Sequence, residues 1–205
     1  MPTEPLAQFG YLDEHVALCL AVRDRLRTNL GLKDNECEIE YDEIAHPSTG
    51  HLFLCVTENG WRPGDANGSY DIEHTIYGVK ITIFYRVAYL PRDRKMHAVL
   101  GEHQYLIAES GLNRVLRNVF RLIDWSYQLK NAADALLLAS GDERQGFIHP
   151  LRFASADPEP RTVQAEMFAS HSSTSKTRSD HDVALAKTIR FDGCDRQVAR
   201  DNVLP

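Results

Sequence analysis

Several features of common protein classes are missing from this chain of 205 residues. It has no long hydrophobic run: the apolar patch from Ala135 to Ala139 falls far short of the roughly 20 residues that a membrane-spanning helix needs. The first residues, from Met1 to Gly10, are polar and include Glu4, so we expect no signal peptide. Basic residues are not in excess, because 23 Lys and Arg stand against 29 Asp and Glu and the net charge is -6. We therefore expect neither a membrane partner nor general nucleic-acid binding, which needs a basic surface.

Cysteine is scarce, and its spacing excludes the common redox motif. The cysteines are far apart in the sequence and form no C-x-x-C pair: Cys19, Cys37, Cys55 and Cys194. Each lies in an apolar periodic segment or next to a turn, which is typical of buried free thiols. We expect reduced cysteines in a reducing cytosol, although two disulfides would also fit the count.

Motifs of catalysis and cofactor binding are missing as well. The chain contains no G-x-S-x-G, no P-loop, no G-x-G-x-x-G and no H-E-x-x-H. His97, Glu102 and His103 lie close together without the spacing of a metal site. His171 and His181 lie in a segment that would not hold metal ligands in place. We expect no catalytic residue, no metal and no cofactor, so function has to be inferred from architecture and charge.

What is present is an ordinary globular composition arranged around one long strand. Hydrophobic residues make up 43% of the chain and charged residues 25%, and the length suits a single domain over residues 1–205. From Val79 to Leu90, β-branched and aromatic residues alternate between two faces, one of which is apolar throughout. Pro91 ends the run because proline cannot donate to the ladder. This pattern predicts a central antiparallel strand with one face in the core.

The remaining elements follow from the same periodicities. Apolar residues at helical spacing predict helices over Leu12–Leu30, Leu112–Asp124 and Tyr127–Leu138, with a weaker helical segment over Met96–Glu109. In the first of them the predicted buried stripe is Leu12, Val16, Cys19, Leu26 and Leu30. Ser110-Gly111 is expected to separate this weaker helical segment from the helix Leu112–Asp124, with Ser110 as the N-cap of the latter.

Alternating residues predict strands over Glu36–Glu43, His51–Thr57, Phe147–Phe153, Thr162–Phe168 and Ala184–Phe191, and Gly78 marks a bulge or bend. We expect loops over Glu58–Ser69 and Ala169–Asp182, a turn at Asp192-Gly193 and a loose tail from Asp195. Strands in runs with helices between them predict an α+β fold, with the helices packed on one face of a mostly antiparallel sheet.

Two charged features stand out from this scaffold. On the strand Glu36–Glu43 the outward-facing side chains form an exposed acidic row: Glu36, Glu38, Glu40 and Asp42. Such a row lines a channel or an interface, coordinates a divalent cation, or protects an edge strand from aggregation. Together with Asp142 and Glu143 it could supply acid–base pairs, but an exposed row lacks the burial that this chemistry needs.

The helix Leu112–Asp124 carries the opposite charge. Its polar side presents a basic stripe of Arg114, Arg117 and Arg121, which suits phosphates, an acidic partner surface or plain solvation. Surfaces of opposite sign on one chain fit a subunit that packs head-to-tail and closes into a ring.

The order of these elements resembles the tail-terminator (tail-completion) proteins of long-tailed phages, and the related caps of contractile tails and injection systems. The resemblance rests on the leading helix, the strand pair His51–Thr57 and Val79–Leu90 with its Tyr89-Leu90-Pro91 step, the arginine-bearing helix, and the final strand Ala184–Phe191 after a long loop. It covers most of the chain and is one of pattern, without a shared short motif. The segment Ser126–Gln145 and the second strand pair make this chain larger than the small terminators.

The resemblance implies a structural neck protein of a virion, assembled in the host cytoplasm, whose subunits form a ring that is often a hexamer. It implies partners in the tail tube or sheath and in the head connector, with DNA passing through the lumen without sequence-specific binding. The acidic row would then line the lumen and let DNA slide. The loop residues His171, Lys176, Arg178 and His181 would become ordered on assembly.

Two alternatives remain open at this point. One is a cytosolic α+β enzyme or small-ligand-binding protein, with its pocket between the Leu112 helix and the sheet. The other is an adaptor that binds one protein partner through the Arg114 face.

Overall fold

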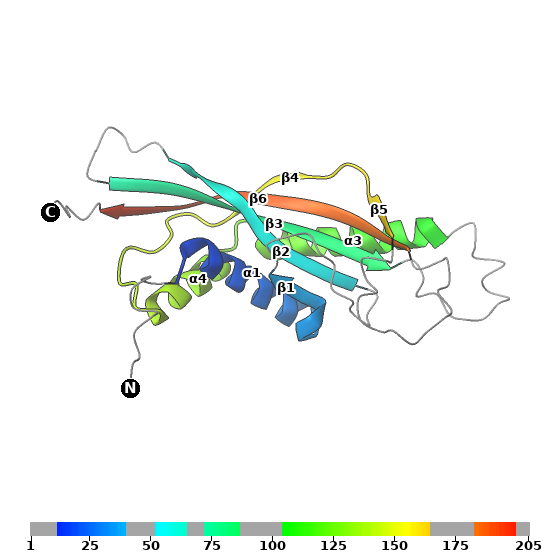
Figure 1. Cartoon of the computed structure of the whole chain (residues 1–205), viewed down its shortest axis with the longest axis horizontal. Coiled ribbons are helices and arrows are strands. Elements are labelled where there is room, and N and C mark those ends of the chain that lie inside the picture. The colour runs from blue at the N-terminus through cyan, green and yellow to red at the C-terminus, as the bar shows by residue number, and fades with distance from the viewer. Residues whose placement is uncertain (1–11, 40–51, 65–71, 87–103, 165–182, 200–205) are drawn as a thin grey trace.

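The computed structural model of the protein describes residues 12–39, 52–64, 72–86, 104–164 and 183–199 (Figure 1). Its helices are α1 (Glu14–Leu30), the short 3-10 helix η1 (Asp34–Glu36), α3 (Gln104–Ile123) and α4 (Tyr127–Ala139). Its strands are β1 (Cys37–Ile39), β2 (Leu52–Pro63), β3 (Ile72–Arg86), β4 (Arg152–Ala156), β5 (Arg161–Gln164) and β6 (Val183–Ala199). They form one sheet in the order β1-β2-β3-β6-β4, with β5 also paired to β6. Every pairing except that of β1 with β2 is antiparallel, which confirms the α+β prediction.

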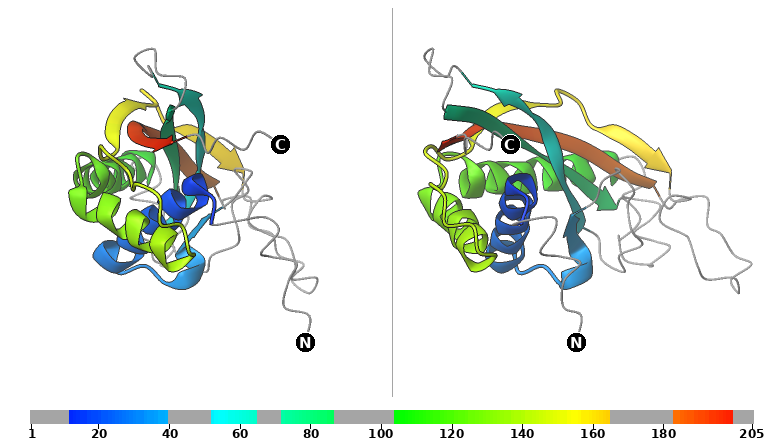
Figure 2. Two further views of the ribbon diagram at one scale, coloured as in Figure 1. Left: turned by 90° about the vertical axis from the view of Figure 1, so that its left-hand side faces the viewer. Right: turned by 60° about the vertical axis from the view of Figure 1, so that its left-hand side comes forward.

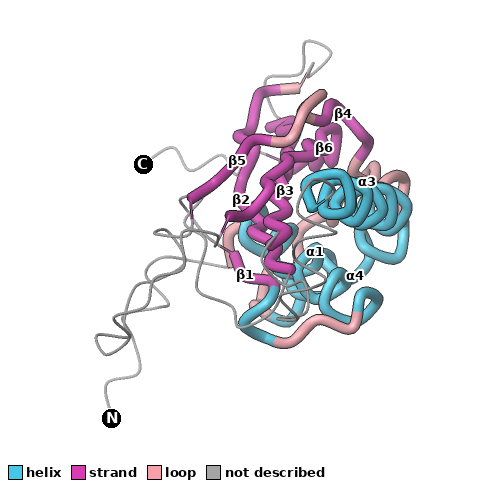
Figure 3. The backbone as a smooth tube through the Cα atoms, turned by 90° about the vertical axis from the view of Figure 1, so that its right-hand side faces the viewer, coloured by secondary structure: helices cyan, strands magenta, loops and turns pink. Residues whose placement is uncertain are grey.

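Helices α1, α3 and α4 lie on one face of this sheet, as predicted (Figure 2 and Figure 3). The core between the two layers is apolar, and its sheet side includes Leu54, Val56, Val79, Ile81, Ile83 and Ile189. Its helix side includes Leu18, Val22, Leu112, Val119, Ile123, Leu129 and Leu137. Each of these side chains contributes about 1.5–3 kcal/mol when it is fully buried, so this layer is the main source of stability.

Strand β3 occupies the centre of the sheet between β2 and β6, which confirms its predicted place. Val79, Ile81 and Ile83 face the helices and are completely buried. The opposite face carries a second small cluster of Phe53, Cys55, Phe84 and Ala186, with partly buried Val163 against it. Residues 87–90 of the predicted strand lie outside the described part of the chain.

Three glycines on neighbouring strands lie where the register of the sheet shifts. Opposite Gly78 of β3, the register shifts on both sides, so β2 and β6 each carry a β-bulge at this level. The bulges contain Gly60 and Gly193, whose φ angles of 78° and 83° suit glycine. Gly78, which was predicted to mark a bulge or bend, lies at the level of both bulges, whose extra residues belong to β2 and β6.

Beyond these bulges the three strands continue together as a β ribbon, formed by residues 61–63, 72–77 and 194–199 (Figure 1). The predicted loop over Glu58–Ser69 is therefore wrong up to Pro63, and so are the turn at Asp192-Gly193 and the loose tail up to Ala199. Every residue of the β2 part is exposed, so no hydrophobic alternation marks it as a strand.

Helix α1 begins and ends with clear capping signals. Asp13 accepts hydrogen bonds from the backbone N–H groups at the start of the helix, and Gly31 ends it with a φ of 64°. The predicted buried stripe is partly wrong, because Val16, Leu12 and Leu30 are only half-buried. The buried residues are His15, Ala17, Leu18, Cys19, Ala21, Val22 and Leu26.

Helix α3 runs without a break through Ser110-Gly111, so the predicted interruption is wrong. Gly111 is needed there because the helix lies directly against Tyr85 of β3. A Cβ atom at this position would come within 2.7 Å of the Tyr85 Cζ atom. Ser110 is therefore an exposed residue inside the helix and does not cap it. Of the apolar stripe predicted for this helix, Leu112, Val119 and Ile123 are fully buried, whereas Val115 and Leu116 are half-buried.

Strands β4 and β5 pair with the same edge of β6, one after the other. The chain between them contains Asp157, whose carboxylate accepts hydrogen bonds from the Thr188 N–H and from Arg190. The predicted strand Phe147–Phe153 is thus displaced, because pairing begins at Arg152. The predicted Thr162–Phe168 strand is confirmed up to Gln164.

All four cysteines are buried and free, as the sequence predicts. Burial raises the pKa of Cys19 and of Cys37 to about 12, and that of Cys194 well above its usual range. Among the described helices, none has the length and the apolar content that crossing a bilayer requires.

Candidate functional site

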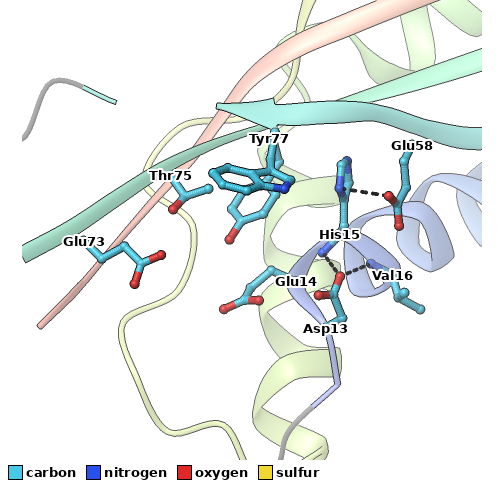
Figure 4. Close-up of a pocket in the computed structure, with 9 residues that line it drawn as sticks. Asp13, Glu14, His15, Val16, Glu58, Glu73, Thr75 and Tyr77 are labelled. Carbon is cyan, nitrogen blue, oxygen red and sulfur yellow. Dashed lines mark hydrogen bonds and ion pairs between the residues drawn. The ribbon is translucent and has the colours of Figure 1, made fainter. Parts of the chain in front are cut away.

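A pocket of about 450 Å³ opens where the start of α1 meets the β ribbon (Figure 4). Nine residues line it: Asp13, Glu14, His15, Val16, Glu58, Trp61, Glu73, Thr75 and Tyr77. Its size falls in the range of roughly 300–1,000 Å³ that is typical of small-molecule sites. We call it the acidic pocket, because four of its lining residues are carboxylates and none is lysine or arginine.

The α1 side of the acidic pocket is held by the helix cap. The Asp13 Oδ1 atom accepts hydrogen bonds from the backbone N–H of His15 at 2.8 Å and of Val16 at 3.2 Å. His15 is buried, and its Nε2 lies 2.6 Å from the carbonyl oxygen of Gly78. Because a carbonyl only accepts, Nε2 carries the hydrogen. The other ring nitrogen, Nδ1, lies 3.5 Å from the Glu58 carboxylate (Figure 4).

The ribbon side of the pocket is formed largely by one face of β3. Glu73, Thr75 and Tyr77 are alternate residues of β3, so they project from the same face. Tyr77 packs edge-on against His15, with 5.4 Å between the ring centroids. Burial, and then the charge of Glu14, raises the pKa of Tyr77 to about 12, so its phenol keeps its proton and remains a hydrogen-bond donor. Trp61, from β2, is 67% exposed.

One of the four pocket carboxylates, that of Glu14, is already paired with arginine. Glu14 Oε1 accepts a hydrogen bond from Arg196 Nη1 at 2.6 Å and lies 3.4 Å from Arg144 Nη2. No arginine or lysine pairs with Asp13, Glu58 or Glu73 in the described part of the chain. The pocket therefore carries surplus negative charge beside aromatic rings. This combination suits an organic cation, such as a guanidinium or ammonium group.

A buried charged network supports the pocket from beneath. Arg196 is only 1% exposed, and its Nε donates to the Gln145 carbonyl at 2.7 Å. Its Nη2 lies 2.8 Å from Asp142 Oδ2, a contact of opposite charges without the alignment of a hydrogen bond. Asp142 also accepts from Arg144, so the carboxylate that the sequence offered for acid–base chemistry is structural. Glu143 is exposed and lies outside this network.

Asp195, a carboxylate on the β6 strand of the ribbon, bridges two histidines. Its Oδ2 lies 2.9 Å from His74 Nε2, and its Oδ1 lies 2.7 Å from His149 Nδ1. Burial alone would raise the pKa of Asp195, but the hydrogen bonds from His74 and His149 hold it below its usual value. Among the residues that the structure describes, no three side chains converge as a metal site requires.

The predicted acidic row is not continuous and exposed in its described part. Glu36 lies in η1, where its carboxylate accepts a hydrogen bond from the backbone N–H of Lys33. Glu38 is half-buried and lies 3.1 Å from Arg27. The expected exposed row is therefore wrong for these two residues, and neither lines the acidic pocket. Glu40 and Asp42 lie outside the described residues.

The predicted basic stripe is exposed along α3, and we call it the arginine face: Arg114, Arg117 and Arg121. Arg117 Nε lies 3.4 Å from the Asn113 carbonyl, and no carboxylate pairs with these arginines in the described part of the chain. The predicted assembly residues His171, Lys176, Arg178 and His181 lie outside the described residues, as do the histidines near position 100.

Sequence patterns did not reveal the acidic pocket. Its residues come from α1, β2 and β3, and each of those three segments looks ordinary by itself. The only local signal was the acidic pair Asp13 and Glu14, which the helix dipole explains equally well. The pocket also lies beside α1, whereas the ligand-binding alternative placed a pocket between the Leu112 helix and the sheet.

Fold and pocket together define an α+β protein with an acidic, aromatic-walled pocket beside a projecting β ribbon. No protein-family model matches the sequence, and no curated protein matches it significantly.

Proposed function

We propose that this protein is a ring-forming structural subunit, a tail terminator in the neck of a phage-like particle, without catalytic activity. The observation that carries the proposal is the β ribbon. It extends past the helix layer, and the outer edge of β2 is unpaired from Thr57 to Pro63 within the described residues, because β1 pairs only with Leu54 to Val56. An open strand edge of this kind is a template for pairing with a neighbouring chain.

The distribution of charge supports self-assembly. The acidic pocket and the arginine face are opposite in charge and share no residue. Two different, complementary surfaces make a heterologous contact, which closes into a ring when the rotation between subunits allows it. An isologous dimer would instead need one self-complementary surface.

The proposed partners follow from this role. A neck ring, for instance a hexamer, contacts the tail tube or sheath on one side and the head connector on the other, and it sits in the virion after assembly in the host cytoplasm. A net charge of -6 is compatible with DNA passing through the lumen without sticking.

The test is the mass of the purified full chain in solution, measured by light scattering at low ionic strength and at increasing concentration. A discrete ring-sized species, seen as an annulus in electron micrographs, is the expected result. A monomer at every concentration would overturn the proposal.

A second candidate function is suggested by the acidic pocket itself. A cavity of about 450 Å³ with carboxylates and aromatic rings is suited to a small organic amine. Calorimetric titration of the monomer with arginine and with linear polyamines would detect such binding. Saturable binding by a protein that never assembles would favour this alternative.

A further inference from the structure

We infer that the acidic pocket is the socket for the arginine face of a second copy of this chain. The inference rests on the proposed ring and deepens it, because it names the two surfaces that meet between neighbouring subunits. Arg114, Arg117 and Arg121 of one subunit would bind at the pocket beside the β ribbon of the next.

The receiving surface has unmatched charge and room for a guanidinium group. Glu58 and Glu73 reach the pocket from β2 and β3, and the Glu58 side chain is 44% exposed. Glu14 is the pocket carboxylate that already has an arginine partner. Trp61 adds an exposed indole, on which a guanidinium plane stacks well.

The arginine face likewise lacks partners of opposite charge within the described residues. Most other arginines of the described residues are paired with carboxylates, for example Arg27 with Glu38 and Arg190 with Asp157. The arginine face differs, because its three guanidinium groups are exposed and none forms an ion pair within the described residues. They lie three and four residues apart, which puts them on one side of the helix within about 11 Å along its axis.

The positions of the two surfaces permit repetition. The arginine face lies on the half of α3 that ends at Ile123, whereas the pocket is lined by residues of α1, β2 and β3 and of the cap Asp13, so the two surfaces share no residue. A subunit that uses one surface therefore leaves the other free for the next neighbour, as a ring requires. The open edge of β2 runs beside the pocket through Glu58 and Trp61, so backbone pairing could add to the charged contact.

Two multiple-substitution variants test the two surfaces separately. Glu58→Gln with Glu73→Gln neutralises the socket, and Arg114→Gln with Arg117→Gln and Arg121→Gln neutralises the arginine face. Each is expected to weaken self-association by at least about 30-fold, as loss of one side of a desolvated charge pair does. The matched control, Glu143→Gln with Glu159→Gln, changes two exposed carboxylates outside the pocket and should assemble like the wild type. All changed residues are polar surface positions, and circular dichroism melting checks that each variant is folded.

Mixing the two defective variants gives the sharpest readout. Only one intact contact can form, between the arginine face of the socket variant and the socket of the arginine variant. Light scattering should therefore show heterodimers and no rings.

Other outcomes overturn the inference. If the wild type forms rings and the socket variant forms them equally well, the socket is wrong while the ring proposal stands. If the mixture rebuilds complete rings, the two surfaces do not meet head-to-tail. If the wild type stays monomeric throughout, the ring proposal fails first and the inference fails with it.

Discussion

Arg196 and Asp142 meet inside the protein, with Nη2 of the arginine 2.8 Å from Oδ2 of the carboxylate and both side chains almost completely shielded from solvent. Arg196 comes from the last described strand and Asp142 from the segment after α4. The pair therefore attaches the end of β6 to the loop that closes the helix layer, directly beneath the acidic pocket.

Replacing Arg196 by methionine should strongly destabilise the fold. The change removes one of the two arginines beside the buried carboxylate of Asp142, together with the hydrogen-bond donor to Glu14, and breaking a buried charge pair costs about 3–5 kcal/mol. Urea-induced unfolding followed by circular dichroism measures the loss. Arg62→Met is the matched control, because Arg62 is 60% exposed and pairs with Asp192 at the surface, where an ion pair contributes about 0–1 kcal/mol. Equal losses of unfolding free energy in the two variants would contradict the conclusion that Arg196 belongs to a buried stabilising network.

The same network should make stability depend on pH in the acid range. Burial alone would raise the pKa of Asp142, but hydrogen bonds from Arg144 and the positive charge of Arg196 hold it at about 2 instead of the usual 3.8. Because the folded-state pKa is the lower one, this stabilisation is complete above about pH 4 and is lost as the pH falls toward 2. At about 1.4 kcal/mol per pKa unit, the loss is on the order of 2 kcal/mol.

The measurement compares the free energy of unfolding of the wild type and Asp142→Asn between about pH 5 and pH 2. The gap between the two proteins should narrow as the pH falls, because the variant has no carboxyl group to protonate. A constant gap over this range would mean that Asp142 is not the titrating group.

Gly111→Ala should destabilise the protein by about 1–3 kcal/mol, because the added methyl group would overlap the Tyr85 ring. On an exposed helix position the same change would stabilise by about 1 kcal/mol, so the sign of the effect is diagnostic. Thermal unfolding measures it.

Ser110→Ala is the neighbouring control and carries its own outcome. If Ser110 capped a helix, its loss would cost about 1 kcal/mol. As an exposed residue within α3, it should be neutral or slightly stabilising when replaced by alanine.

The cysteines should be unreactive while the protein is folded. Cys19, Cys37, Cys55 and Cys194 are buried and free, and burial raises the pKa of the Cys19 and Cys37 thiols to about 12, so thiolate is scarce at neutral pH. A thiol-specific colorimetric reagent should react slowly with the native protein and with four thiols per chain in denaturant. Rapid reaction of the native protein would contradict this burial.

Local periodicity was sufficient for the elements that bury one clear face. The alternation around Val79 predicted the central strand, and the stripe from Leu112 to Ile123 predicted the core side of α3, because burial of a repeating apolar face decides both. The α+β class and the buried cysteines followed from the same reasoning. The neck-protein function and its partners stay predictions.

Local sequence patterns could not predict the candidate site. Glu58 and Trp61 lie in an exposed stretch with two nearby glycines, which local chemistry describes equally well as a loop. Arg196 lies in a charged C-terminal segment, where nothing local predicts a side chain that is 1% exposed.

The sequence by itself therefore determined which segments are helices and strands, wherever their own periodicity creates an apolar face that must be buried. The tertiary structure decided which local conformation the glycines produce. Gly60 and Gly193 are bulges rather than chain reversals because both lie opposite Gly78, where the neighbouring strand supplies backbone hydrogen bonds on each side. Pairing with a neighbour is a long-range property, and it alone extends the strands into the β ribbon that forms one wall of the acidic pocket.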